Sequence, residues 1–216
     1  SDNAEIPGIA DQGPPESASV ALDAARAFGE AGDPEAALGA YLDATGVDPG
    51  DLDDDLLMEI AAVAYQAGNA PLAAEYWSIA AARGGAGADE ARNRLYSLAV
   101  KGEEPEMLRT IVEELRSSDQ LTTGRILDAG EAMERMGDGA EAAAYYSEAL
   151  ASGALADRAS VLFRLAQILE LPGNARDLKR SLGLYEEIVS QYPLSPHWEV
   201  SAARMEYIRR HFLDIR

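Results

Sequence analysis

The side chains best suited to metal chemistry gather in one short stretch, DPGDLDDDLLME. Asp51, Asp53 and Asp55 alternate there as the first ligands of an EF-hand calcium loop do. The rest of that loop is absent, because Leu56 stands where the sharp turn needs glycine and Ala62 stands where the bidentate glutamate belongs. We expect these carboxylates to cap a helix N-terminus, where backbone N–H groups and the helix dipole favour negative charge.

The two histidines are the other candidates for metal or acid–base chemistry. His197 and His211 are too far apart in sequence to bind a metal from adjacent turns of a helix. The sequence contains no Gly-rich phosphate loop and no nucleophile elbow. Adjacent acids such as Glu186 and Glu187 are common in a chain with 38 acidic residues, so they do not indicate a general acid and base. The sequence therefore predicts a protein that is not an enzyme, with no catalytic residues, metal or cofactor.

Composition indicates a helical protein that avoids nucleic acid. The chain has 216 residues, of which 47% are hydrophobic, and it contains no cysteine. Its net charge of −20 repels phosphate backbones, which bind proteins by displacing counterions with Lys and Arg. The charge is uneven along the chain: residues 1–100 hold four basic and 18 acidic side chains, whereas residues 174–216 hold seven basic and six acidic.

A repeat of 34 to 36 residues organises the chain. Glycines recur with this spacing at Gly32, Gly68, Gly102, Gly137 and Gly173, each after a helix-like stretch. Because glycine adopts a left-handed conformation without strain, each is expected to end the first helix of a helical hairpin.

Both helices of each hairpin share a register of small and large residues. In the second helices, small residues recur at Ala37, Ala73 and Ala142 and again at Ala44, Ala80 and Ala149, around aromatic positions at Tyr41, Trp77 and Tyr146. In the first helices, the small positions are Ala25, Ala61, Gly130 and Ala166, followed three residues later by Phe28, Ala64, Met133 and Leu169. A small residue beside a large one permits two helices to approach closely.

This pattern resembles the tetratricopeptide repeat, which runs W-x2-L-G-x2-Y, then A-x3-F, then P. The clearest repeats are AFGEAGDPEAALGAYLDATGVDPG, which places Pro49 at the terminal proline position, and AGEAMERMGDGAEAAAYYSEAL. The resemblance implies an all-α fold, a right-handed α-solenoid of about five such hairpins plus a C-terminal capping helix.

Two repeats depart from the pattern. In the third, the spacing places Met107, Ile111 and Glu114 at the Ala, aromatic and Ala positions. In the fifth, the sequence LPGNARDLKR delays the second helix by three residues, so that Ser181 and Tyr185 take the small and aromatic positions.

The repeat defines the expected domain organisation. Residues 1–16, rich in Pro and Gly, are expected to form a flexible leader or tether. The repeat domain spans 17–194, with hairpins at about 18–51, 54–87, 88–121, 123–157 and 159–194. Residues 195–216 form the capping helix, with Ser195 as its N-cap and Pro196 as its first residue. One apolar face of this helix offers a further contact for a partner through Trp198, Met205 and Phe212.

In tetratricopeptide-repeat proteins the first helices line a concave groove, so the resemblance implies a partner-binding surface there. The side chains expected to line it are Arg26, Met58, Tyr65, Arg92, Tyr96, Glu131, Phe163 and Gln167. Tyr65, Arg92 and Tyr96 are the expected anchors, since aromatic and arginine side chains dominate binding energy at interfaces. Each arginine is either neutralised by a neighbouring carboxylate or presented to an anionic group of the partner.

The C-terminal stretch LYEEIVSQYPLSPHWEVSAARMEYIRRHFL is also similar to terminal repeats of bacterial envelope lipoproteins of the barrel-assembly and Tol-associated type. This similarity implies a periplasmic protein, anchored to the outer membrane by a lipid if a lipidated leader precedes Ser1. The expected function is a protein-interaction scaffold that binds a peptide segment or helical element of another protein. Two alternatives stay open: a subunit of a homo-oligomer and a small-molecule carrier or accessory protein.

Overall fold

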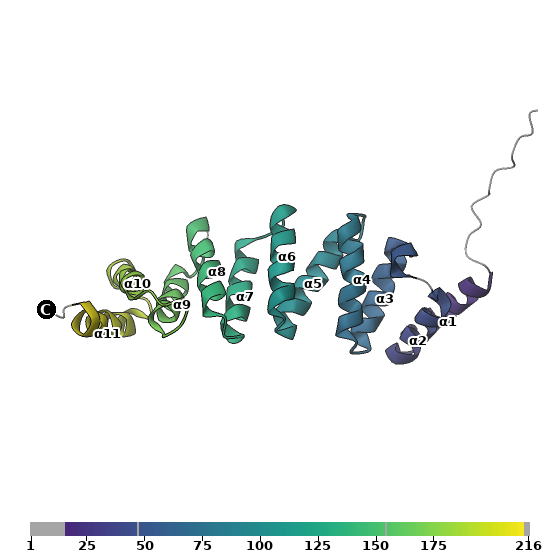
Figure 1. Cartoon of the computed structure of the whole chain (residues 1–216), viewed down its shortest axis with the longest axis horizontal. Coiled ribbons are helices and arrows are strands. Elements are labelled where there is room, and N and C mark those ends of the chain that lie inside the picture. The colour runs from purple at the N-terminus through teal and green to yellow at the C-terminus, as the bar shows by residue number, and fades with distance from the viewer. Residues whose placement is uncertain (1–15, 47, 154, 214–216) are drawn as a thin grey trace, which may run out of the picture. The chain divides into compact units, whose positions relative to one another are not determined.

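The computed structural model describes residues 16–46, 48–153 and 155–213, and within these ranges it contains helices and no strand (Figure 1). The chain divides into two compact units, residues 1–95 and 96–216. The N-terminal unit contains α1 (Glu16–Glu30), α2 (Pro34–Thr45), the short 3-10 helix η1 (Pro49–Asp51), α3 (Asp54–Gln66), α4 (Ala70–Arg83) and the first part of α5 (Ala88–Gly102). The C-terminal unit contains the rest of α5, α6 (Pro105–Ser117), α7 (Thr123–Arg135), α8 (Gly139–Ser152), α9 (Arg158–Glu170), α10 (Leu178–Gln191), α11 (Trp198–Ile208) and the π-helical turn η2 (Arg209–Leu213).

Small residues bring the paired helices of the N-terminal unit together. Helix α1 packs on α2, α3 packs on α4, and α2 also contacts α3. Ala25 of α1 and Ala37 of α2 are fully buried, as are Ala61 of α3 and Ala73 of α4. Phe28 is 44% exposed, although its counterpart Ala64 in α3 is buried, because α1 packs only against helices that follow it in the described part of this unit.

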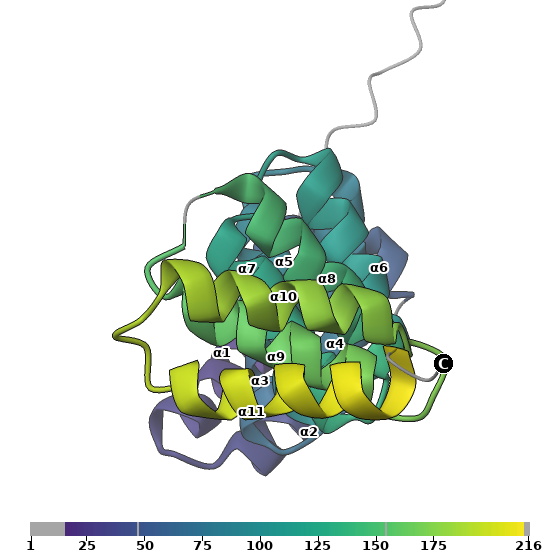
Figure 2. The same ribbon diagram turned by 90° about the vertical axis from the view of Figure 1, so that its left-hand side faces the viewer.

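The C-terminal unit repeats this packing in α7/α8 and α9/α10. Helices α7 and α8 cross closely at Gly130 and Tyr146, where a Cβ atom on the glycine would lie 3.0 Å from the ring. Helix α11 then packs against α10, and Figure 2 shows the two helices side by side. The apolar face expected on the terminal helix thus contributes to packing within this unit.

Acidic and amide side chains start most of the second helices. The side chains of Asp33, Asn69, Asp138 and Asp177 each accept a hydrogen bond from a backbone N–H of the first turn that follows. Asp53 does the same at α3, accepting from the Leu56 N–H at 2.8 Å. The interpretation of the acidic stretch as a helix cap is therefore confirmed, as each capping bond satisfies a donor that the helix leaves unpaired.

The expected glycine caps are found in three hairpins and are wrong in two. Gly32, Gly68 and Gly137 have φ values between 78° and 81°. Gly102 instead remains helical, and the left-handed residue that follows α5 is Glu103, with φ 55°. In the fifth hairpin, α9 ends at Glu170, before Gly173, whose φ of 154° is far from the left-handed helical value.

The register of the third hairpin is consequently shifted by one residue from the expected one. Leu108, Val112 and Leu115 are fully buried where Met107, Ile111 and Glu114 were expected, and Glu114 is exposed. In the fifth hairpin, the expected delay of three residues is confirmed, because Ser181, Tyr185 and Ile188 are fully buried.

The corrected register places Tyr96 at the small-residue position of α5. Its ring is 7% exposed, and its hydroxyl donates to the carbonyl oxygen of Arg125 at 2.6 Å. A tyrosine at this position keeps two helix backbones apart. Accordingly, the part of α5 in the C-terminal unit approaches α6 less closely than the helices of the other hairpins approach each other.

The terminal helix begins later than the sequence predicts. Helix α11 starts at Trp198 and not at Pro196, because Ser195 belongs to a turn. The Ser195 hydroxyl accepts from the His197 N–H at 3.1 Å, and the Ser195 carbonyl accepts from the Trp198 N–H at 3.1 Å. At the other end of the chain, residues 1–15 of the expected leader lie outside the described residues.

Candidate protein-binding surfaces

A tyrosine, a glutamate and an arginine join neighbouring helices at the fourth hairpin. The Tyr146 hydroxyl of α8 donates to Glu134 of α7 at 2.8 Å. Arg164 of α9 donates to the same hydroxyl oxygen at 3.0 Å and forms an ion pair with Glu134 at 3.4 Å. The arginine therefore links α9 to the preceding hairpin at the tip of a buried tyrosine.

The same arrangement recurs at the fifth hairpin. The Tyr185 hydroxyl of α10 donates to Glu170 of α9 at 3.1 Å. Arg204 of α11 donates to both carboxylate oxygens of Glu170, through Nε at 3.1 Å and through Nη2. This bidentate pair is the polar bond that fixes α11 over α9.

In the N-terminal unit, a similar network has the acid and the base in exchanged positions: the arginine belongs to the same hairpin as the tyrosine, and the glutamate belongs to the next hairpin. The Tyr41 hydroxyl of α2 donates to Glu59 of α3 at 2.7 Å, and Arg26 of α1 donates to both oxygens of Glu59 at 2.9 and 3.1 Å. The hydrogen bonds from Arg26 lower the pKa of the Glu59 carboxyl, with a further contribution from Tyr41 that opposes partial burial. Arg26, one of the expected groove residues, is thus neutralised within the chain.

The tyrosines of these networks are protonated at neutral pH. Burial raises the pKa of Tyr41 and Tyr146 far above the usual range and that of Tyr185 to about 12. A phenol held protonated by burial is neither a nucleophile nor a base at neutral pH. The networks therefore stabilise the surface of the first helices as a fixed polar framework.

Arg92, an expected anchor, is also engaged within the chain. Its side chain is 17% exposed and donates to the Ala81 carbonyl at 3.1 Å and to Asp89 at 2.8 Å. Arg125 and Arg158 likewise donate from the first turn of a first helix to a carbonyl oxygen near the end of the preceding hairpin. The three arginines are 33 residues apart, a regular spacing that identifies them in the sequence as part of the repeat.

The remaining residues expected in the groove differ in exposure. Tyr65 is 42% exposed and its ring lies 5.7 Å from that of Trp77. Met58 is half-buried against the backbone of Gly87, and Glu131 is exposed and paired with Arg164 at 3.1 Å. Phe163 is half-buried and stacks on His197 with centroids 4.4 Å apart, whereas Gln167 is exposed and lines a cleft.

Two of the three residues expected to offer a contact on the terminal helix are half-buried, and one is exposed. The indole N–H of Trp198 donates to the Val189 carbonyl at 3.0 Å, which ties the start of α11 to α10. Met205 is half-buried and lines a shallow depression on α11. Phe212 is 42% exposed and lines the same cleft as Gln167.

This cleft, with a volume of about 540 Å³, lies beside α9 and α11 in the C-terminal unit, and we refer to it as the terminal cleft. Its floor includes Ile168 and the fully buried Tyr185. Its accessible walls are formed by Gln167, Leu171, Arg176, Val200, Tyr207 and Phe212. The terminal cleft therefore combines exposed apolar side chains with polar groups held on helices.

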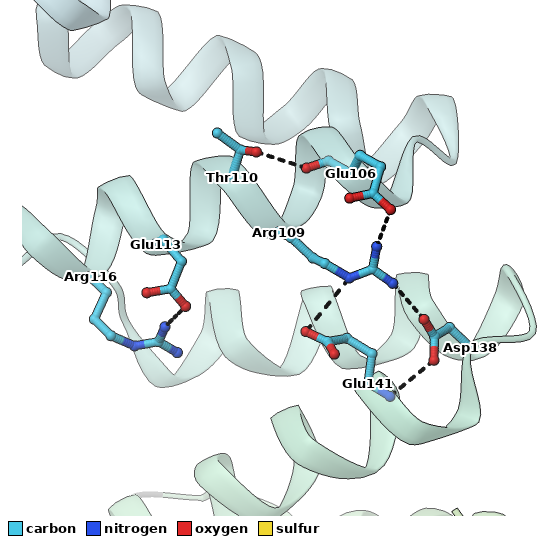
Figure 3. Close-up of polar contacts among 7 residues, drawn as sticks. All are labelled: Glu106, Arg109, Thr110, Glu113, Arg116, Asp138 and Glu141. Carbon is cyan, nitrogen blue, oxygen red and sulfur yellow. Dashed lines mark hydrogen bonds and ion pairs between the residues drawn. The ribbon is translucent and has the colours of Figure 1, made fainter. Parts of the chain in front are cut away.

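A separate charged cluster joins α6 to α8 (Figure 3). Arg109 donates to Glu106 at 2.6 Å and to Asp138 at 2.6 Å, and its Nε lies 3.9 Å from Glu141. Asp138 uses its other carboxylate oxygen to cap α8. Because each charge in this cluster has a partner, the cluster serves to connect the third and fourth hairpins.

The arrangement most like a catalytic one is a contact between Ser160 and His197. The Ser160 hydroxyl lies 2.9 Å from Nε2 of His197, but its proton is directed to Asp157 at 2.6 Å. The carboxylate thus accepts from the serine and does not orient the histidine, in contrast to a hydrolytic triad. Within the described ranges, no group of three or more His, Asp or Glu side chains could hold a metal ion, and none of the helices described there is long and apolar enough to cross a membrane.

No protein-family model matches the sequence, and no curated protein is significantly similar to it. The structure is similar to that of MamA AMB-1, with a TM-score of 0.50 and 14% identity over 82% of this chain and 93% of that chain. A second structure of MamA has a TM-score of 0.49, with 15% identity over 93% of this chain and 98% of that one. A tetratricopeptide repeat protein from Parabacteroides merdae ATCC 43184 has a TM-score of 0.48, with 15% identity over 91% of this chain and 73% of that one.

The fold class expected from the sequence is confirmed by the helices and their register. Among the described residues, the first, second, fourth and fifth hairpins bury small and aromatic residues at recurring positions, and the third buries Leu108, Val112 and Leu115 at the equivalent positions of its second helix. A terminal helix packs on the last hairpin. The chain has the all-helical repeat fold of tetratricopeptide-repeat proteins.

Proposed function

We propose that this protein is a non-enzymatic scaffold that binds a peptide segment or helical element of a partner protein on the surface of its first helices. The observation that supports this proposal is the terminal cleft, where the expected groove residue Gln167 lies among apolar side chains that are open to solvent. A concave site lined by apolar groups and a few fixed polar groups is the usual form of a binding site.

The surroundings of the terminal cleft suit binding more than catalysis. Glu170 and Arg204 neutralise each other, and Tyr185 is held protonated by burial, so the walls offer fixed donors and acceptors. Leu171 and Val200 are 62% and 48% exposed, so covering them with a partner removes apolar surface from water.

Selection of peptides tests this function directly. Random peptides of about twelve residues, displayed on phage, would be selected on the immobilised full chain, because a segment of this length has enough side chains to fill one standard binding groove. We expect the selection to enrich peptides that bind the wild-type chain. These peptides should bind less tightly to a variant that combines Gln167→Glu and Leu171→Ser, since both side chains line the cleft and are exposed. Glu113→Gln on α6, outside the cleft, is the control. A failure to enrich any peptide, or equal binding by the cleft variant, would contradict the proposal.

We further propose that the protein acts in the bacterial envelope. The support is the similarity of the C-terminal stretch, from Leu184 onward, to terminal repeats of envelope lipoproteins. Fractionation of cells that make the protein from its own gene tests this placement: recovery with periplasmic or outer-membrane markers is expected, and recovery only with cytoplasmic markers would contradict it.

A further inference from the structure

The cations of this chain are distributed unevenly between those with a carboxylate partner and those without one. Within the described ranges, ion pairs engage Arg26, Arg83, Arg92, Arg94, Arg109, Arg116, Arg135, Arg158, Arg164, Arg204 and Arg209. Lys101, Arg176, Lys179, Arg180 and Arg210 have no such partner in the part of the chain that the structure describes, and all five are exposed. Four of the five lie between residues 176 and 210. In a chain of net charge −20, this leaves the C-terminal end as a place where positive charge is available.

One of these cations lines the terminal cleft. The guanidinium of Arg176 lies 5.6 Å from the centroid of the Phe212 ring, a distance at which the ring attracts the cation. Arg204 lies 4.6 Å from the Tyr207 ring in the same cleft, but Glu170 already neutralises it. Arg176 is therefore the positive charge in the cleft wall that a ligand can reach without displacing a carboxylate from the described part of the chain.

Apolar side chains surround this charge. Leu171, Tyr207 and Phe212 line the cleft and are 62%, 42% and 42% exposed. Exposed apolar groups of this size around a positioned guanidinium are characteristic of interaction sites, where arginine and aromatic residues contribute most of the binding energy.

We propose that the terminal cleft recognises a peptide segment in which an Asp or Glu side chain lies next to a large apolar side chain. The carboxylate binds the guanidinium of Arg176, whose planar donors match two carboxylate oxygens. The apolar side chain occupies the space lined by Leu171, Tyr207 and Phe212. This inference rests on the proposed scaffold function and specifies the chemistry of the partner.

The overall charge of the chain favours a ligand with a single local carboxylate over an extended polyanion. Nucleic acid or an anionic membrane presents a dense array of negative charge, which a protein of net charge −20 repels beyond the immediate site. A short acidic and apolar segment places its negative charge only at Arg176 and gains the rest of its affinity from apolar contact.

Fluorescence anisotropy with matched synthetic peptides tests the proposal. The probe is a fluorescein-labelled amphipathic peptide of about twelve residues with Glu beside Leu and Phe, and its partners carry Gln or Lys in place of Glu, which changes charge while preserving length. We expect the Glu peptide to bind the full chain about tenfold more tightly than the Gln peptide, the usual value of one charge-assisted hydrogen-bonded pair. The Lys peptide should bind least tightly.

Variants of the chain assign the effect to one residue. Arg176→Glu should remove the preference for the Glu peptide, and Arg176→Lys should retain most of it. Arg94→Glu makes the same change in net charge at an exposed position of the N-terminal unit, and it should retain the preference. Circular dichroism of each variant verifies that the helices are intact.

The outcomes separate this inference from the function on which it rests. Library peptides could bind at the cleft while the Glu and Gln peptides bind the wild-type chain equally, or while the Arg176→Glu variant binds both peptides as tightly as the wild type does. In either case the scaffold function stands and the proposed partner chemistry is wrong. If no peptide binds and sedimentation shows a dimer that Phe212→Ala dissociates, the cleft is covered by a second copy of the chain and both proposals are wrong.

Discussion

Gly130 of α7 and Tyr146 of α8 meet so closely that a Cβ atom on the glycine would lie 3.0 Å from Cε1 and 3.1 Å from Cδ1 of the ring. The ring is buried, and its hydroxyl is fixed by Glu134 and Arg164, so it cannot move aside freely. This contact explains why the small-residue position of the fourth hairpin holds glycine.

Replacing Gly130→Ala should therefore destabilise the protein, although alanine is the better helix former. We expect a loss of about 1–3 kcal/mol in the free energy of unfolding, the usual cost of overpacking a core. Gly183→Ala in α10 is the matched control, because a Cβ atom there meets no other atom within 4 Å, and it should stabilise by about 0.5–1 kcal/mol. Denaturant unfolding of both variants measures the difference; equal effects would mean that the crossing is looser than described.

The corrected register of the third hairpin predicts that Gly102→Ala and Gly137→Ala have opposite effects on the stability of the protein. Glu103 has a left-handed backbone, so Glu103→Gly should relieve strain and stabilise the protein by about 1 kcal/mol. The loss of the distant ion pair between Glu103 and Arg135 reduces this gain only slightly. Gly102→Ala should also stabilise, since Gly102 is helical. Gly137→Ala, at the left-handed position of the next hairpin, should instead destabilise. Thermal melting of the three variants tests this; a destabilised Gly102→Ala would restore the register expected from the glycines.

Ser201 of α11 is fully buried, and its hydroxyl has no hydrogen-bond partner within the described structure. A buried hydroxyl without a partner costs about 1–3 kcal/mol, so Ser201→Ala should raise the stability of the protein by about 1 kcal/mol. Ser181→Ala is the control, because the Ser181 hydroxyl donates to the Ala166 carbonyl at 2.8 Å, and its loss should destabilise. Calorimetry of the two variants gives the signs, and a destabilised Ser201→Ala would show that the hydroxyl has a partner.

Alkaline pH should unfold the protein through its buried tyrosines. Burial raises the pKa of Tyr185 and of Tyr145 to about 12, above the value of about 10 in an unfolded chain. The neutral phenol is thus favoured in the fold, so its contribution to stability is complete below about pH 10 and is lost as the pH rises toward about 12. Denaturant midpoints measured across this range should fall less steeply for Tyr185→Phe than for the wild type. An identical pH dependence would show that Tyr185 titrates as it does in the unfolded chain.

The hairpins could be predicted from the sequence because their register depends on local spacing. Tyr41, Tyr146 and Tyr185 are buried as the spacing predicts, the last despite the three-residue delay before α10. The register of the third hairpin was misplaced by one residue because the spacing assigned the left-handed position to Gly102, whereas Glu103 occupies it. One residue corresponds to about 100° around a helix, so this error moved the core positions of α6 onto a different face.

The binding surface was less predictable, because spacing does not reveal what a charged or aromatic side chain contacts. Arg26 and Arg92 face carboxylates within the chain, and Tyr96 is buried against the backbone of α7. The terminal cleft also depends on Leu171 and Arg176, which lie in the loop between α9 and α10 and belong to no periodic pattern. Their proximity to Phe212 is a consequence of how α11 packs on α10.

Amide hydrogen exchange of the full chain, with and without the tightest-binding library peptide, tests the central claim most directly. The account predicts that the peptide slows exchange in the loop after α9 and along α11, which line the terminal cleft, while α6 and α8 exchange at unchanged rates. Slowed exchange confined to α6 and α8, or unchanged exchange around the cleft despite saturation with peptide, would contradict the assignment of partner binding to the terminal cleft.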